Sequence, residues 1–171
     1  MCIYTYQGKR PCAFWAWGHA KDDGHKTMAE TDDFNPMGCN CVALRQAARQ
    51  VTQLYERHMA PLGLRVTQYS ILSRLARHGA LSINQLAETM VMDRTTTSRA
   101  IGPLRRDRLI ATEASEDGRK RVIALTKAGE ARVKAARAGW RAAQAEFEKL
   151  YGAGEAARLR AELARAATVG R

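Results

Sequence analysis

The chain has 171 residues, of which 46% are apolar and 26% charged, and its formal net charge is +11. This length suits one domain with an appended element, so it excludes a two-domain enzyme with a large substrate cleft. All of the excess of Lys and Arg over Asp and Glu lies after residue 38. We therefore expect nucleic acid as the partner of this part of the chain, with an anionic membrane surface as the alternative.

Neither a membrane segment nor a secretory signal is expected. The apolar runs fall well short of the roughly 20 residues that a membrane helix needs, and the apolar stretch before Gly18 is too short for the core of a signal peptide. We predict a cytoplasmic protein with no membrane partner. In a reducing compartment its cysteines remain thiols instead of forming a disulfide scaffold; they are Cys2, Cys12, Cys39 and Cys41.

Residues 1–38 show neither helical nor alternating periodicity, and they mix Gly, Pro, Trp, His and acidic residues. We predict that they form a poorly ordered leader, and Met28 or Met37 is a candidate for the natural start. The alternative is an ordered N-terminal arm that packs its aromatic side chains on a partner subunit.

The predicted domain, residues 39–171, begins with a helix at about 41–60. Apolar residues recur in this helix at steps of three and four, and Pro61 and Gly63 follow it. One face of the helix is therefore apolar, and we expect it to take part in dimerisation.

A winged helix is predicted at about 67–126. Thr67 is expected to cap its first helix, which ends at Gly79. Ser82 and Gln85 then form a capping box in front of a short helix with one apolar face.

A second short helix is predicted at about Asp93–Arg106, with Asp93 as its N-cap. Two short helices joined by a tight turn make a helix-turn-helix. The β-rich runs 109–114 and 121–125 flank the polar residues 115–120, which predicts a hairpin with a charged tip. This hairpin is the wing.

The C-terminal helices are predicted at about 127–168. Thr126 caps the first of them, Gly152 and Gly154 break the run, and Leu163 is expected to point inward. A single winged helix cannot cover the apolar faces at both ends of the chain, which predicts a homodimer. The expected fold class is therefore mainly α: a winged helix-turn-helix with a small β-hairpin wing and N- and C-terminal dimerisation helices.

The helix at 93–106 is expected to read DNA. Its buried face is predicted to contain Thr97, Ala100, Ile101 and Leu104. Its outward face carries side chains that suit guanine, the thymine methyl group or phosphate in the major groove, namely Arg94, Thr95, Thr96, Ser98 and Arg99. In the wing, Arg119 and Lys120 are expected to contact phosphates or the minor groove, and Asp117 to orient Arg119. The alternative is a solvated helix face.

These features resemble the MarR family of dimeric winged-helix regulators over nearly all of residues 39–171. The resemblance is carried by SINQLA at 82–87, DRTT at 93–96, Arg99, Leu109-Ile110, Asp117-Gly-Arg119, Leu125-Thr126 and Gly129. It implies a triangular homodimer, a pseudo-palindromic operator in double-stranded DNA, and repression as the usual mode. It also implies release by a small ligand or by cysteine oxidation. Arg108 departs from the family, which commonly has Gly at that position.

Cys41 lies at the start of the first predicted helix, where the helix amides stabilise a thiolate. Similarity to the organic-hydroperoxide-sensing branch of the family implies that Cys41 is reactive and Tyr55 lies near it, although Arg45 and Val66 replace two other tyrosines. Cys39 is a second thiol for a disulfide, or half of a metal site with Cys41. Two unreactive cysteines are the third interpretation. No metal ion or other cofactor is predicted.

A small aromatic ligand is the other candidate signal. Family resemblance implies that Tyr55, His58 and Tyr69 line its cleft, and core packing is the alternative for each. The rival functions are a nonspecific architectural DNA-binding protein, a metal-responsive regulator using Cys39 and Cys41, and an enzyme with Cys41 as nucleophile. The chain has no phosphate-binding glycine loop and no His or acid at a suggestive spacing from Cys41, so no enzyme is predicted.

Overall fold

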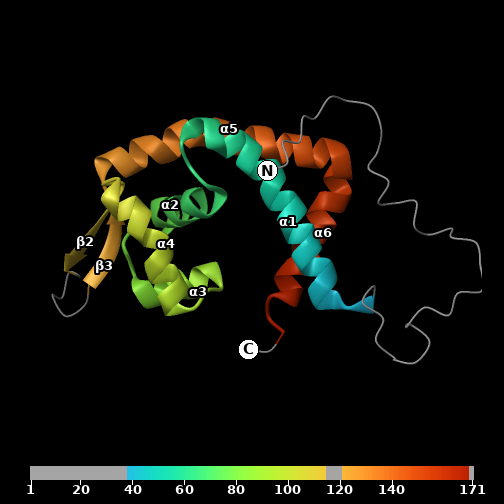
Figure 1. Cartoon of the computed structure of the whole chain (residues 1–171), viewed down its shortest axis with the longest axis horizontal. Helices are drawn as coiled ribbons and strands as arrows, with labels where there is room; N and C mark the ends of the chain where they lie inside the picture. The colour runs from blue at the N-terminus through green and yellow to red at the C-terminus, as the bar shows by residue number, and fades with distance from the viewer. Residues whose placement is uncertain (1–37, 115–120, 170–171) are drawn as a thin grey trace, which may run out of the picture. The chain divides into compact units, whose positions relative to one another are not determined.

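A computed structural model of the chain describes residues 38–114 and 121–169 (Figure 1). Its contacts divide the chain into two compact units, residues 1–43 and 44–171. In the first unit the described residues contain the start of helix α1 (Asn40–Met59). The predicted leader lies outside the described residues apart from Gly38.

The second unit is mainly α-helical and includes a three-stranded antiparallel sheet, which confirms the predicted fold class. After α1, the 3-10 turn η4 (Ala60–Leu62) ends at Gly63, whose φ of 66° lies in the left-handed region that favours glycine. No helix of the described residues is long and apolar enough to cross a membrane.

Helix α2 (Val66–His78) begins earlier than predicted, with Arg65 as its N-cap, so the prediction of Thr67 as the cap was wrong. The backbone N–H of Arg65 donates to Gln68 Oε1 at 2.8 Å, and the N–H of Val66 donates to Glu56 Oε1 at 3.0 Å. These side chains satisfy two amides at the helix end without Thr67.

The helix-turn-helix consists of α3 (Ile83–Met90) and α4 (Arg94–Arg106). Ser82 and Gln85 form the predicted capping box of α3, and Asp93 caps α4 as predicted, accepting from the N–H of Thr96 at 2.8 Å. Between the helices, Val91 adopts the left-handed conformation with φ of 53°. The turn is therefore as tight as predicted.

The wing strands are β2 (Ile110–Ala114) and β3 (Arg121–Leu125), which pair in an antiparallel register that joins Ala114 to Arg121. A third strand, β1 (Leu81–Ser82), pairs with β3 and gives the order β1-β3-β2. Strand β1 was not predicted from the sequence, because two residues are too few to show alternation.

Helices α5 (Lys127–Tyr151) and α6 (Ala153–Ala166) complete the unit. Thr126 caps α5 as predicted, but only Gly152 lies between the helices, with φ of 94°. Gly154 was wrongly predicted to break the run, since it fits within the first turn of α6. Leu163 was predicted to point inward, but it is 42% exposed in the single chain.

The core of the second unit lies between α2, α3, α4, the sheet and the first half of α5. Its fully buried large side chains are Met59, Ile71, Leu72, Leu86, Thr97 and Leu104. Helix α5 approaches the neighbouring backbone closely at two glycines, Gly129 and Gly139. A Cβ on Gly129 would collide with the carbonyl of Leu109, and one on Gly139 would lie 2.9 Å from the carbonyl oxygen of His58. Both crossings need the absence of a side chain.

Candidate nucleic-acid interface and adjoining cavity

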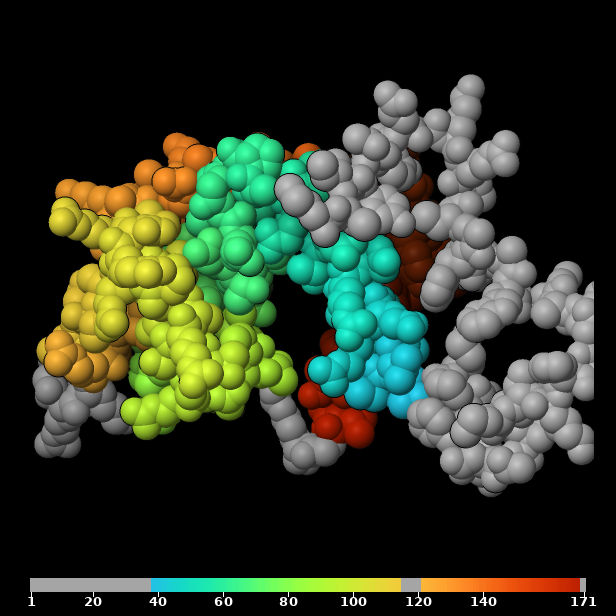
Figure 2. Space-filling model, in the orientation of Figure 1, coloured from blue at the N-terminus to red at the C-terminus, as the bar shows by residue number. Residues whose placement is uncertain are grey.

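Helix α4 has the two faces that the sequence predicts. Thr97, Ile101 and Leu104 are buried and Ala100 is half-buried. The outward residues are all exposed: Arg94, Thr95, Thr96, Ser98 and Arg99. In Figure 2, α3 and α4 lie at the surface of the face that is drawn, in lime and yellow-green. The structure thus brings these five side chains together on one accessible surface, and their contacts with DNA stay a prediction.

Asp93 fixes the first turn of α4. Its carboxylate accepts hydrogen bonds from the hydroxyl and the backbone N–H of Thr96, which hold the pKa of Asp93 below its ordinary value. The Thr97 hydroxyl donates to the Asp93 carbonyl oxygen at 2.9 Å, so this buried polar group is satisfied. A fixed first turn holds the outward side chains before any DNA is bound.

The exit from α4 turns sharply at Arg108, whose φ is 55°. This is the position at which the sequence departs from the family's glycine, and Arg108 adopts the conformation that glycine adopts at low cost. The Thr126 hydroxyl donates to the Arg108 carbonyl oxygen at 2.7 Å and ties the exit to the start of α5. Pro103 lies within α4, and Gly102 before it has no Cβ to meet the proline ring.

The tip of the wing lies outside the described residues. Asp117, Arg119 and Lys120 therefore have no described position, and their predicted roles stay predictions. The described strand ends next to the tip, Ala114 and Arg121, are paired with each other and exposed.

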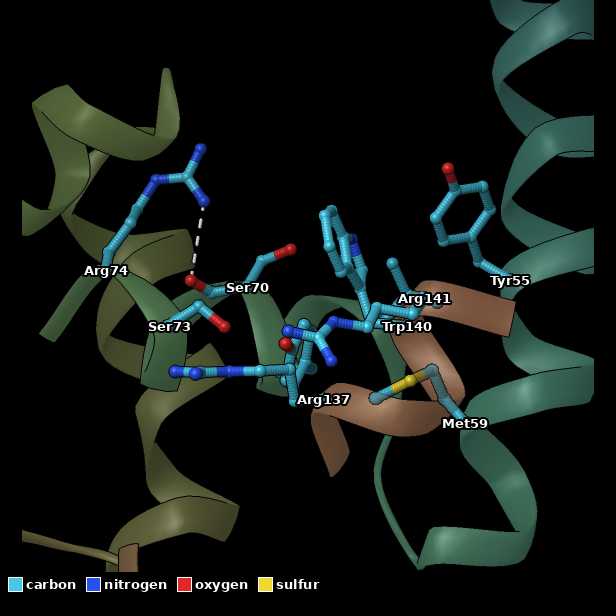
Figure 3. Close-up of a pocket in the computed structure, with 10 residues that line it drawn as sticks. Tyr55, Met59, Ser70, Ser73, Arg74, Arg137, Trp140 and Arg141 are labelled. Carbon is cyan, nitrogen blue, oxygen red and sulfur yellow. Dashed lines mark hydrogen bonds between the residues drawn. The ribbon is translucent and has the colours of Figure 1, made fainter. Parts of the chain in front are cut away.

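A cavity of about 490 Å³ lies between α1, α2 and α5 in the second unit. Figure 2 shows the surface hollowed between α1 and α2, and Figure 3 shows its side chains. Of the three residues predicted to line a ligand cleft, Tyr55 and Tyr69 line this cavity and His58 does not; binding of a ligand there stays a prediction. Instead, His58 Nε2 lies 2.6 Å from Glu146 Oε2, on an edge of the α1–α5 contact that Arg57 also joins.

The cavity is strongly basic, which the sequence did not predict. It is lined by three arginines, Arg74 of α2 and Arg137 and Arg141 of α5, and by no acidic residue. Burial raises the pKa of the Tyr55 hydroxyl, which donates to Gln144 Oε1 and is neutral. The spacing of Arg137 and Arg141 by four residues indicated a shared helix face, but nothing in the sequence indicated that Arg74 meets them.

Ser73 adds an unused polar group to this cavity. Its Oγ is buried and has no hydrogen-bond partner among the described residues. In Figure 3 the guanidinium groups of Arg137 and Arg141 extend from α5 toward the part of α2 that carries Ser70 and Ser73. Three cations, one free hydroxyl and the ring of Trp140 form a site suited to a planar anion.

The two cysteines among the described residues, Cys39 and Cys41, are free thiols. Cys41 is exposed in the first turn of α1, and Cys39 is partly buried. The described residues contain no group of three or more His, Cys, Asp or Glu side chains that could hold a metal ion.

Comparisons with known proteins agree with this architecture. A sequence model of the MarR family matches residues 62–121. The transcriptional regulator MosR of M. tuberculosis, solved in complex with DNA, is 35% identical with a TM-score of 0.68; the match covers 75% of this chain and 93% of that one. A probable transcriptional regulator from Pseudomonas aeruginosa is 30% identical with a TM-score of 0.69; the match covers 77% and 98%.

A more distant structure shares the fold alone. CouR from Rhodococcus jostii RHA1, solved with p-coumaroyl-CoA, is 20% identical with a TM-score of 0.68, and the match covers 80% of this chain and 97% of that one. No curated protein sequence matches the chain. Three observations agree: the chain is 35% identical to MosR over nearly the whole length of MosR, the family model matches the winged helix, and the polar face of α4 is exposed. The chain belongs to the MarR family of DNA-binding transcription regulators.

Proposed function

We propose that this protein is a dimeric, sequence-specific repressor that acts in the cytoplasm on a pseudo-palindromic operator. The observation that carries the proposal is the outward face of α4, where Arg94, Thr95, Thr96, Ser98 and Arg99 are all exposed on a helix stabilised by a buried face. Arg and Thr are the side chains that contact guanine and thymine in the major groove. The similarity to MosR, which was solved bound to DNA, supports the same use of the fold.

Within this proposal, α4 selects the sequence and the wing positions the protein. Helix-turn-helix proteins place the N-terminal residues of the second helix against base edges, and cations beside it contact phosphates. Arg119 and Lys120 are proposed to serve the second role, with Asp117 orienting Arg119. No chemistry of bond cleavage enters the proposal, and the protein is not assigned as an enzyme.

The proposal is tested by comparing Arg99→Ala with Lys120→Ala on a duplex enriched by in vitro selection. Loss of a base contact costs about 1–3 kcal/mol and relaxes specificity at that base, whereas loss of a phosphate contact weakens all binding and reduces the salt slope by about 1. Fluorescence anisotropy with the selected and a scrambled duplex, over a range of salt, separates the two effects. Arg77→Ala is the control, because Arg77 is an exposed cation at the end of α2.

Equal affinity of the wild type for the selected and the scrambled duplex would contradict sequence-specific regulation. That outcome would favour the nonspecific architectural alternative.

Release from DNA is proposed to follow binding of a small aromatic ligand in the cavity or oxidation of Cys41. The basic, aromatic lining of the cavity supports the first route, and the exposure of Cys41 supports the second. Operator binding by wild type and Cys41→Ser, each with and without cumene hydroperoxide, decides between them. Release of the wild type alone would establish oxidation. Unchanged binding throughout would eliminate it and leave the ligand.

A further inference from the structure

A network of hydrogen bonds joins three helices at the end of α5 that lies away from α4 (Figure 1). The Tyr55 hydroxyl of α1 donates to Gln144 Oε1 of α5. The Nε2 of Gln144 donates to Glu148 Oε1 at 3.1 Å, and Nη1 of Arg160 in α6 donates to the same oxygen at 3.3 Å. We call these four residues the helix-junction network. Within the described part of the chain, its Arg160–Glu148 contact is the only side-chain hydrogen bond between α6 and another helix.

A single glycine connects α5 to α6 beside this network. Gly152 has φ of 94° and ψ of 132°, a conformation that favours glycine. Because Gly152 has no Cβ, its backbone restricts the direction of α6 less than another residue would. Small residues at the ends of elements commonly absorb the dihedral changes of hinges. The direction of α6 therefore depends on contacts outside the connection, and the network and the buried Ala156 supply such contacts.

A small change in the angle between α5 and α6 produces a large displacement of the winged helix relative to α6. The winged helix packs against the first half of α5, where Val133 and Ala136 belong to its core. Val133 lies roughly 28 Å along α5 from Gly152. A rotation of about 10° at Gly152 would therefore move the winged helix by about 5 Å relative to α6. One base pair of duplex DNA spans about 3.4 Å, so the displacement exceeds one step of the operator.

In the proposed dimer, α6 is one of the helices that meet the second copy. Leu163 of α6 is 42% exposed in the single chain and Leu44 of α1 is 44% exposed, so both helices carry apolar surface that a second copy would cover. Once a second copy holds α6, the angle between α5 and α6 fixes the distance between the α4 helices of the two copies. That distance has to match the separation of the two half-sites in the operator.

We propose that the helix-junction network sets the half-site spacing that the dimer accepts. Glu148 holds Arg160 of α6 against α5, and Gln144 links Glu148 to Tyr55 of α1, so the two α4 helices stay at one separation. Without the network, the dimer still forms but accepts half-sites at more than one separation. The four residues are positioning residues, which act on DNA recognition through α6. This inference deepens the proposed function and rests on it.

The test uses the full chain and a series of duplexes that carry the selected operator with one or two base pairs inserted or removed between its half-sites. Fluorescence anisotropy measures the affinity for each spacing, and sedimentation velocity measures the oligomeric state. We expect the wild type to bind its preferred spacing about tenfold more tightly than spacings one base pair longer or shorter, because avidity is lost when both half-sites cannot be engaged together.

In Glu148→Ala, this ratio of affinities should fall to about threefold or less, while the protein stays dimeric and its affinity for the preferred spacing changes little. Its melting temperature should also change little, because the side chains of Glu148 and Arg160 are 33% and 53% exposed, and such ion pairs add little to stability. Glu162→Ala is the matched control. Glu162 pairs with Arg165 within α6, so its loss removes the same charge without freeing α6, and the wild-type ratio should be kept.

An unchanged ratio in Glu148→Ala, with or without a uniform loss of affinity, would overturn the proposal, because the network would then have no part in spacing. Dissociation of this variant into monomers would overturn it as well, because the network would then serve assembly. If Glu148→Ala melts early, Arg160→Gln makes the same comparison from the more exposed partner. Failure of the proposed function is recognised separately, in the wild type alone, as equal affinity for selected and scrambled duplexes.

Discussion

Arg108 is held in the left-handed region with φ of 55°, and its side chain is exposed. A residue with a Cβ adopts this conformation at a cost of about 1–2 kcal/mol. Replacing it with glycine removes this cost, but glycine loses more backbone entropy on folding, which offsets part of the gain. We expect Arg108→Gly to raise the free energy of unfolding by about 0.5–1 kcal/mol in urea denaturation.

Arg105→Gly is the matched control, because it removes the same charge from the helical last turn of α4. It should destabilise the protein by about 1 kcal/mol. Equal destabilisation by the two substitutions would show that the backbone at Arg108 carries no such cost.

Glu146 provides a pH-dependent contribution to stability. Hydrogen bonds from His58 and Arg57 hold its pKa below the ordinary value of 4.5. Because the folded pKa is depressed, the contribution is complete above the unfolded pKa and is lost as pH falls through the folded pKa. The melting temperature of the wild type should therefore fall more steeply below about pH 4.5 than that of Glu146→Gln. Parallel melting profiles of the two proteins would contradict this assignment.

At the scale of elements, the crossing of α5 over the end of α1 depends on Gly139. A Cβ there would lie 2.6 Å from Leu62 Cδ1 and 2.9 Å from the carbonyl oxygen of His58. The backbone oxygen cannot move aside as a flexible side chain can, so Gly139→Ala should destabilise the fold by about 1–3 kcal/mol. Thermal unfolding followed by circular dichroism measures this loss.

Gly154 offers the opposite case, because a Cβ on it would have no neighbour within 4 Å. Gly154→Ala should leave stability unchanged or raise it by up to about 1 kcal/mol. If both alanine variants behaved alike, close approach at Gly139 would not be the cause.

The elements that the sequence predicted well are those with local signals. Asp93, Ser82 and Thr126 are caps whose partners lie three residues away, so their roles follow from spacing alone. Thr67 was wrongly predicted as the cap of α2, because Glu56 satisfies an amide at the start of that helix instead. Glu56 lies ten residues before Val66, so this contact depends on tertiary structure and not on local spacing. The basic cavity was missed for the same reason, since Arg74 and Arg137 meet only after folding.

At the scale of the whole molecule, the terminal helices leave apolar side chains in solvent in the single chain. Leu150 is 72% exposed and Tyr151 is 49% exposed, and Leu44 and Leu163 are also exposed on α1 and α6. Apolar surface of this kind is expected to be covered by a second copy. We expect Leu150→Glu to shift the protein toward the monomer in sedimentation experiments and to weaken operator binding, because each half-site would then be bound separately.

Val91→Glu is the control for this substitution. Val91 is similarly exposed but lies in the α3–α4 turn, outside the terminal helices. It should leave the sedimentation behaviour unchanged. If Leu150→Glu and Val91→Glu dissociated the protein equally, the terminal helices would not be the specific site of contact between two copies.

The absence of acidic residues from α4 has a kinetic consequence. Every charged side chain within the helix is an arginine: Arg94, Arg99, Arg105 and Arg106. The positive charges of α4 outnumber the two acidic residues that flank it, Asp93 and Asp107, and attract the DNA polyanion over a distance set by the Debye length, about 8 Å at physiological ionic strength. Association is therefore steered and becomes slower as salt is added, whichever sequence is met. We expect the arginines to speed encounter with any duplex, and the threonines and serine between them to set how long the protein stays on a given sequence.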